Sequence, residues 1–309
     1  MRALIFITMI AGVIQAPATP LVQAPAPPPG TDIYLVPFSG DVPTMATAKP
    51  VPISIAPGYD NQPSFSPDGR RILFAGNRDG KQIDVYEFDR PSGRVRQLTQ
   101  TAENENSPTY LPAGVGAPGG FSVVQTEPDR AQRLWRFDAS GKNPQLILAD
   151  IKPVGYHAWM DADRLVLFIL GTQGKPATLQ IASVQTGKAE TVADGPGRSL
   201  HRIPGTALAS FVQRESSGEY WIKQIDPASK KIDPLVKAVD GSSDRDMAWL
   251  PDGKTVLMSS GSRVFAWTRG ATGWTEVFDA AAHQLGVVSR IAVSPKGEAV
   301  AIVVAEPKK

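Results

Sequence analysis

Short apolar runs recur along this chain, and the same turn-forming phrase introduces each of them. The phrase reads Pro-Ser-Phe-Ser-Pro-Asp-Gly at 63–69 and Met-Ala-Trp-Leu-Pro-Asp-Gly at 247–253, with looser copies elsewhere. Its bulky third residue falls at six positions, separated by 45, 49, 44, 46 and 44 residues: Phe65, Tyr110, Trp159, Ile203, Trp249 and Val293. A period of about 40–50 residues is typical of repeat proteins, whose units bury their apolar faces against one another.

Each repeat predicts four β-strands that become more polar in order. The phrase forms the first strand, and a continuous apolar run such as 71–75 or 165–170 forms the second. Short continuous runs rich in β-branched residues are typical of strands buried on both faces. A third strand alternates, as at 83–88, and a glycine-containing turn leads to a polar fourth strand at 94–98. In a blade of a β-propeller, the strands become more exposed to solvent from the central axis to the outside, so this order of strands predicts such blades.

The two ends of the chain complement each other. The sixth repeat ends before its third and fourth strands, whereas Asp-Ile-Tyr at 32–34 copies the third-strand sequence Asp-Val-Tyr at 84–86. A further strand at 51–55 contains Pro52, which suits an outer edge. We therefore expect an all-β, six-bladed propeller over residues 31–309, in which strands from both termini complete the last blade and leave no unpaired half-sheet.

Residues 1–18 have the features of a secretory signal peptide. Arg2 precedes an apolar stretch at 3–14, and Ala-Pro-Ala ending at Ala18 fits the small-x-small cleavage rule. The stretch is shorter than the roughly 20 residues of a membrane span. Residues 19–30 form a Pro/Ala-rich linker. We expect cleavage after Ala18 and a periplasmic or secreted mature protein without a membrane span; an uncleaved N-terminal anchor is the alternative.

Charge and cysteine content exclude several classes of function. The 309 residues carry a net charge of +2, and their Lys and Arg residues are scattered instead of gathered in a basic stripe. We therefore expect no nucleic-acid partner. The absence of cysteine excludes disulfides, thiolate metal sites and cysteine nucleophiles. We expect the mature protein to be a monomer.

The phrase Pro-x-aromatic-Ser-Pro-Asp-Gly, with Asn-Arg-Asp-Gly after it at 77–80, resembles the repeats of the TolB-like propeller family. The likeness is closest at 62–110 and 246–258. TolB carries an additional α/β domain, so this chain resembles a stand-alone propeller of the family. The resemblance implies an envelope protein that binds peptide segments of a partner at the mouth of the central channel. It also implies relatives that cap prolyl oligopeptidase-type hydrolases or act as metal-dependent pectate-fragment lyases, and the fold alone does not choose among these.

The loops that enter the innermost strands of a propeller converge at one mouth of its channel, and here they are rich in polar residues. We expect a binding surface for an envelope protein or peptide segment at this mouth, formed by Asp60, Asn61, Glu105, Asn106, Tyr156, His157, Arg198, His201, Asp244, Asp246 and Arg290. Such a mixture of acids and bases suits an extended peptide with polar and charged groups. A hydrated funnel without a ligand is the alternative interpretation.

A metal site is a second possibility at the same mouth. His157 and His201 both stand two residues before the bulky position of their repeats. Imidazoles are good ligands for zinc and other transition metals, and Glu105 or Asp246 would complete such a site. We expect a protein without a cofactor. The alternative is a lyase or hydrolase that binds a divalent metal at this mouth and acts on a carbohydrate or a peptide.

Three other patterns lack the context of a site. The Gly-x-Gly-x-x-Gly sequence at 114–119 leads into a strand, whereas a dinucleotide site needs a helix there. Ser199 and His201 share a strand face, but no nucleophile elbow or orienting acid accompanies them. The acidic segment 240–246 lacks the EF-hand pattern. The leading hypothesis is thus a non-enzymatic binding module of the bacterial envelope; a structural propeller that acts with a separately encoded hydrolase is a further alternative.

Overall fold

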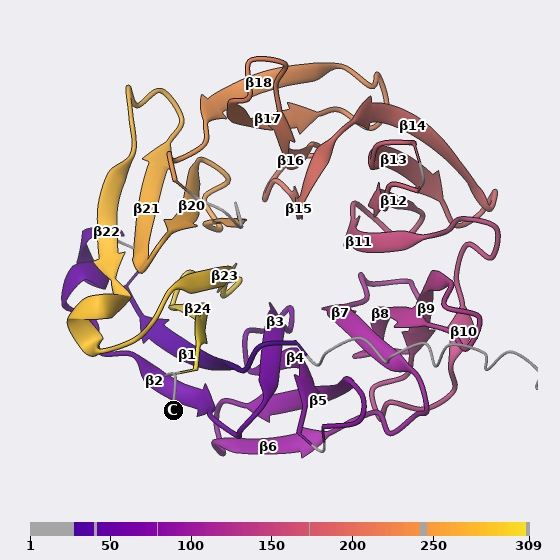
Figure 1. Ribbon diagram of the computed structural model, residues 1–309, viewed down its shortest axis with the longest axis horizontal. Helices are drawn as coiled ribbons and strands as arrows, with labels where there is room; N and C mark the ends of the chain where they lie inside the picture. The colour runs from indigo at the N-terminus through magenta and orange to yellow at the C-terminus, as the bar shows by residue number, and fades with distance from the viewer. Residues whose placement is uncertain (1–27, 40–41, 79, 173, 242–245, 307–309) are drawn as a thin grey trace, which may run out of the picture.

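The computed structural model describes residues 28–39, 42–78, 80–172, 174–241 and 246–306, and the predicted signal peptide lies outside them. This part of the chain consists mainly of β-strands, which form sheets arranged around a central axis (Figure 1). Within a sheet, the first strand lies nearest the axis and the fourth lies at the outside. None of the helices in these ranges is long and apolar enough to cross a membrane.

Four of the sheets each contain four consecutive antiparallel strands. The second repeat forms β7 (Asn104–Tyr110), β8 (Phe121–Thr126), β9 (Gln132–Phe137) and β10 (Gln145–Leu146). The third forms β11 (Val154–Trp159), β12 (Arg164–Ile169), β13 (Thr178–Ser183) and β14 (Lys188–Asp194). The fourth forms β15 (Pro196–Arg202), β16 (Ala209–Arg214), β17 (Tyr220–Ile225) and β18 (Ile232–Lys237), and the fifth forms β19 (Met247–Trp249), β20 (Thr255–Ser260), β21 (Arg263–Thr268) and β22 (Thr275–Asp279).

A larger sheet brings strands from the two ends of the chain together. β24 (Ala299–Ala305) pairs antiparallel with β1 (Thr31–Pro37) along the full length of both strands. β23 (Val288–Val293) flanks β24, and β2 (Val51–Ser54) flanks β1. A parallel bridge between Thr31 and Tyr59 joins this group to the first-repeat strands β3 (Tyr59–Phe65), β4 (Arg71–Asn77), β5 (Asp84–Asp89) and β6 (Arg94–Gln97). The short 3-10 helices η1 (Val42–Thr47) and η2 (Ala280–His283) complete the described elements.

The apolar core lies between neighbouring sheets. On one face of β4, Phe74 packs in a cluster with Ile33 and Val303 from the terminal strands. On the other face, Leu73 packs with Phe121 of β8. Successive side chains of a strand point to opposite faces, so an inner strand must be apolar throughout to fill both interfaces. This is why the second strand of each repeat is a continuous apolar run.

Tryptophans at the bulky position of the repeating phrase pack between neighbouring sheets. Nε1 of Trp159 donates a hydrogen bond of 2.9 Å to Ser122 Oγ on β8, and Nε1 of Trp249 donates one of 2.7 Å to Ser210 Oγ on β16. Both indoles are buried. Each bond joins the innermost strand of one repeat to the second strand of the repeat before it, and it satisfies an indole N–H that would otherwise be buried without a partner.

The fourth repeat is displaced by one residue from its predicted register. In every repeat, the residue after the bulky position donates its N–H to the carbonyl at, or just before, the start of the second strand; these donors are Ser66, Leu111, Met160, Ile203, Leu250 and Ser294. The spacing predicted Ile203 at the bulky position, and this prediction was wrong. Arg202 holds that position, and Ile203 is buried in a cluster with Met247 and Trp249.

Candidate functional site

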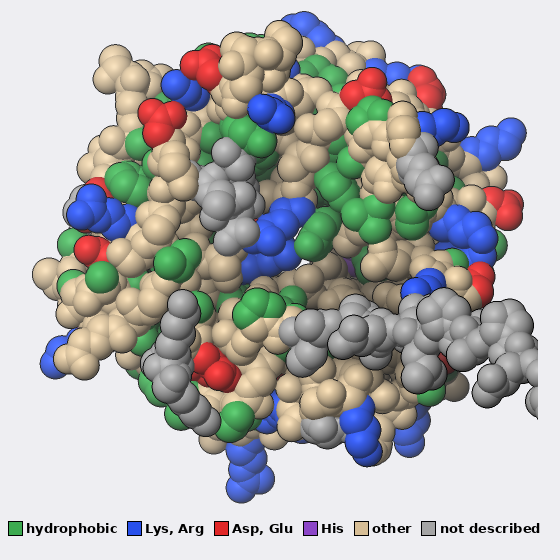
Figure 2. Space-filling model, viewed as in Figure 1, with side chains coloured by type: hydrophobic (Ala, Val, Ile, Leu, Met, Phe, Trp, Pro, Cys, Tyr) green, Lys and Arg blue, Asp and Glu red, His purple; other side chains and the backbone are tan. Residues whose placement is uncertain are grey.

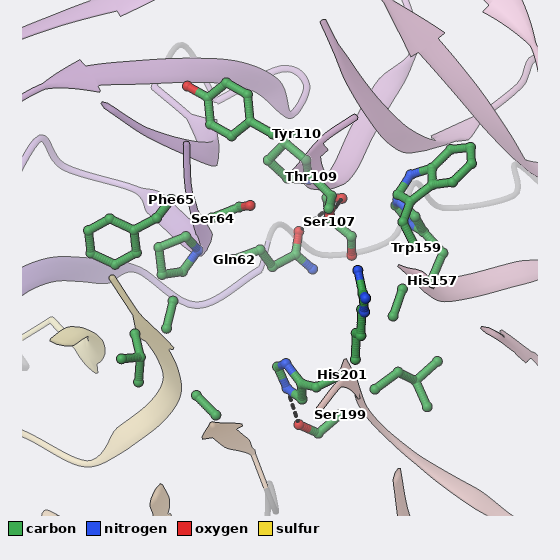
Figure 3. A pocket seen from close by; sticks show the side chains of 18 of the residues that line it. Gln62, Ser64, Phe65, Ser107, Thr109, Tyr110, His157, Trp159, Ser199 and His201 are labelled. Atoms are coloured by element: carbon green, nitrogen blue, oxygen red, sulfur yellow. Dashed lines mark hydrogen bonds between the residues drawn. The ribbon is translucent and has the colours of Figure 1, made fainter. Parts of the chain in front are cut away.

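A cavity of about 480 Å³ lies along the axis of the ring, between the innermost strands (Figure 3). Among its lining residues are six polar side chains, each three residues before the bulky position of its repeat: Gln62, Ser107, Tyr156, Ser199, Asp246 and Arg290. The strand pairing is irregular around these positions in the first two repeats, and the backbone is left-handed at Gln62 (φ 58°) and Ser107 (φ 53°). Bulges re-aim side chains, and here they accompany polar groups that line the cavity.

Three of these six side chains also hold neighbouring innermost strands together. Gln62 Oε1 accepts a hydrogen bond of 2.6 Å from the N–H of Ser107. Ser199 Oγ accepts one of 3.0 Å from the N–H of Met247, and Asp246 Oδ2 accepts one of 2.7 Å from the N–H of Ile291. Sequence reasoning missed Gln62, Ser107 and Ser199, although their constant offset from the bulky position was a signal that could have identified them.

Arg290 and Tyr156 form a bridge across the channel. β23 and β11, which carry them, lie on opposite sides of the ring (Figure 1), yet Arg290 Nη2 donates a hydrogen bond of 3.0 Å to Tyr156 Oη. The guanidinium carbon of Arg290 also lies 5.1 Å from the centre of the Tyr156 ring, within the range of a cation–π contact. Arg198 of β15 donates to the carbonyl of Ser289 at 2.9 Å. Basic side chains accordingly occupy the centre of the ring in Figure 2.

The cavity lies on one side of this bridge. Its described lining begins at the level of Gln62 and Arg290 and continues to Pro67, Pro204 and Pro295, in the turns that follow the innermost strands. Pro67 and Pro295 are exposed, so the cavity reaches solvent at this end, which we call the turn end. The sequence predicts a binding surface at the opposite end, where loops enter the innermost strands, whereas the cavity reaches solvent at the turn end.

The predicted site residues consequently fall into two groups. The residues of the first group line the cavity: Tyr156, His157, Arg198, His201, Asp246 and Arg290. Asp60, Asn61, Glu105 and Asn106 do not contribute to the described lining, and the first three of them are buried between strands. Asp244 lies outside the described residues.

The buried carboxyl groups serve the contacts between sheets. Glu105 is fully buried and accepts hydrogen bonds from the hydroxyls of Thr99, at 3.0 Å, and Thr101. Burial raises the pKa of Glu105 to about 8, although both hydroxyls act against the rise. Asp60 contacts the Ser54 hydroxyl and lies 3.4 Å from Arg78 Nη2, and burial again raises its pKa. Burial keeps Glu105 neutral near pH 7, so Glu105 is a poor partner for a charged ligand.

The two histidines do not occupy equivalent positions. His157 pairs opposite Leu167 on β12, and the hydrogen-bond register of the fourth repeat gives that place to Leu200, opposite Phe211. His201 is therefore offset by one residue, and a one-residue offset turns a side chain to the other face of its sheet. The prediction that the two histidines occupy matching positions in their repeats was therefore wrong.

Each histidine has a hydroxyl partner of its own. His157 Nε2 lies 2.7 Å from Ser122 Oγ, and burial lowers the pKa of His157 to about 4. His201 Nε2 lies 3.0 Å from Ser199 Oγ (Figure 3), and burial lowers the pKa of His201 as well. Both rings are thus neutral at physiological pH. The ranges that the structure describes contain no group of three or more His, Cys, Asp or Glu residues able to hold a metal ion.

Comparison with known proteins identifies the fold. No protein-family model matches the chain. A curated, uncharacterized protein of Agrobacterium fabrum is 27% identical over 115 residues, which are 37% of this chain and only 34% of that protein. The match therefore spans about a third of the relative's length.

Solved structures are similar over most of the chain. A protein of Agrobacterium tumefaciens assigned to TolB has a TM-score of 0.70 at 15% identity, covering 91% of this chain and 100% of that one. TolB of Acinetobacter baumannii has a TM-score of 0.56 at 14% identity, covering 91% of this chain and 65% of that one. An oligogalacturonate lyase in complex with manganese has a TM-score of 0.50 at 12% identity, with 80% and 89% covered. The chain has the TolB-like propeller fold that its repeats predict, and identities this low show the fold alone.

Proposed function

We propose that this TolB-like propeller is an exported, non-enzymatic binding module, which holds an extended peptide segment of a partner protein in its axial cavity. The observation that carries the proposal is the cavity itself. Its volume of about 480 Å³ lies within the range of ligand sites, and it combines apolar walls with a few converging polar groups, as such sites do. Innermost strands of several repeats contribute to it, so the ring holds its shape.

The proposal includes a closed ring of six blades. The pairing of β1 with β24, flanked by β2 and β23, supports a last blade shared by the two termini. Closure removes the exposed edges at which an open array would pair with other chains. A rigid ring also lowers the entropic cost of binding, because the side chains that meet the ligand are ordered beforehand.

Export and the envelope location remain part of the proposal. They are supported by the signal-like pattern at residues 1–18 and by the resemblance of the repeats to TolB-like envelope proteins. A periplasmic protein of this kind would meet peptide segments of envelope partners directly.

An enzymatic role has less support from the cavity. Ser199, whose hydroxyl contacts His201, also accepts the N–H of Met247 and so ties two strands together. The carboxylate of Asp246 is likewise engaged by the N–H of Ile291. These contacts explain the polar groups as parts of the ring, without a role in bond breaking.

The test is capture of a partner by a protein whose cavity has been filled. Mature protein is immobilised and exposed to an envelope extract of its own source, and captured proteins are cross-linked and identified by mass spectrometry. Ser64 lines the cavity, so Ser64→Trp should abolish capture, whereas Ser217→Trp on an exposed turn should not. Equal capture by both variants, or cross-links confined to outer strands, would contradict the proposal.

A further inference from the structure

We propose that the cavity receives its peptide tail first and that the guanidinium of Arg290 binds the terminal carboxylate. This inference rests on the proposed function and specifies the ligand: a segment that ends in a free C-terminus. It is carried by the charge of the lining, by the incomplete hydrogen bonding of Arg290 and by the bridge that crosses the channel at Arg290.

The lining favours an anion. Among the described residues, it contains three arginines, Arg198, Arg202 and Arg290, against one carboxylate, that of Asp246. The two histidines add no positive charge near neutral pH, because burial holds both in the neutral form. A buried positive charge attracts an anionic group far more strongly than an exposed one does.

Arg290 has donors to spare for such a group. Its side chain is 12% exposed, and Tyr156 Oη is the one hydrogen-bond acceptor that the described residues offer its guanidinium. Asp246 Oδ1 lies 3.7 Å from Nη1, an ion-pair distance that is too long for a hydrogen bond. A guanidinium carries five N–H donors in a planar fork that matches a carboxylate. Arg290 therefore keeps donors that a carboxylate in the cavity would satisfy.

The Arg290–Tyr156 bridge at the inner end of the cavity favours a chain terminus over an acidic side chain. The bridge between Arg290 and Tyr156 crosses the channel at the base of the cavity, and the opening to solvent lies at the turn end. An internal Asp or Glu would require the peptide either to pass the bridge or to leave through the opening by which it entered. A C-terminus needs a single extended strand to reach Arg290. The apolar walls, which include Phe65, Leu111 and Pro295, would cover the side chains of that strand.

The experiment compares two mixtures of N-acetylated random pentapeptides that contain no Asp or Glu. One mixture ends in a free carboxylate and the other in an amide, and capture on the immobilised mature protein is read by mass spectrometry. The best-captured sequences are then titrated in both forms by calorimetry. A charge-assisted hydrogen bond predicts at least about tenfold tighter binding of the free acid. An amidated peptide with one internal Glu should bind no better than the plain amide.

Variants assign the preference to Arg290. Arg290→Gln should remove the difference between acid and amide, whereas Tyr156→Phe, which takes away a competing acceptor and keeps the ring, should preserve it. Arg94→Gln on exposed β6 is the matched control and should bind as the wild type does. If Arg290→Gln fails to fold, the comparison of acid and amide on the wild-type protein decides by itself.

Each outcome bears on a distinct claim. Equal capture of acid and amide would overturn this inference and leave the proposed function standing. Capture of neither mixture would count against both. Stronger competition by free galacturonate than by acetate would also overturn it, because the anion site would then belong to a sugar acid.

Discussion

Replacing Glu105 by glutamine should remove a loss of stability that the wild type shows as the pH rises to neutral, even though the residue is fully buried and hydrogen-bonded. Burial raises the pKa of its carboxyl from 4.5 to about 8, so the folded state holds this group protonated when the unfolded state does not. The carboxyl therefore contributes its full stability below the unfolded pKa of 4.5. That contribution is lost as the pH rises toward 8.

The size of the effect follows from the shift. Between the two pKa values, the carboxyl is ionised in the unfolded state but protonated in the folded state. The free energy of unfolding therefore falls by about 1.4 kcal/mol for each pH unit. Glutamine has nearly the shape of the neutral carboxyl and does not titrate, so its curve lacks this slope. The difference in free energy of unfolding between Glu105→Gln and the wild type should therefore grow, in favour of the variant, by about 2.5 kcal/mol from about pH 5.5 to about pH 7.5.

Urea unfolding, followed by tryptophan fluorescence at several pH values, measures this difference directly. Glu276→Gln, which changes an exposed carboxylate on β22, is the control and should follow the wild-type curve. Equal slopes m for all three proteins would show that the same surface unfolds in each. Parallel curves for Glu105→Gln and the wild type would refute the reasoning, because Glu105 would then ionise in the fold as it does in the unfolded chain.

Three further predictions concern the ring, export and metals. Deletion of residues 31–57 should expose the apolar edge of β24 and cause aggregation in size-exclusion chromatography; a monomeric product with unchanged thermal stability would contradict ring closure. N-terminal sequencing of exported protein should show cleavage after Ala18, and recovery of the intact chain in the cytosol would contradict export. Zinc or manganese should shift the melting temperature equally in the wild type and in the His157→Ala, His201→Ala double variant, since the histidines face different sides of their sheets. A metal-dependent stabilisation confined to the wild type would show that they do share an ion.

The local pattern of the sequence determined the strands and the kind of fold. The apolar run at 71–75 lies within β4, and the run at 299–304 lies within β24, because a strand buried on both faces must be apolar at every position. The repeating phrase placed Trp159 and Trp249 at its bulky position, and the period of the repeats predicted the propeller. These are properties of short segments and their spacing, so they can be read without coordinates.

The tertiary structure alone decided the site. The one-residue offset in the fourth repeat separates His201 from its supposed match to His157, and spacing along the chain cannot reveal it, because turn lengths vary between repeats. Arg290 and Tyr156 are 134 residues apart in sequence and meet only because the ring places their strands opposite each other. Local sequence sets which face a side chain takes within its strand, whereas contacts across a ring depend on the packing of all the sheets together.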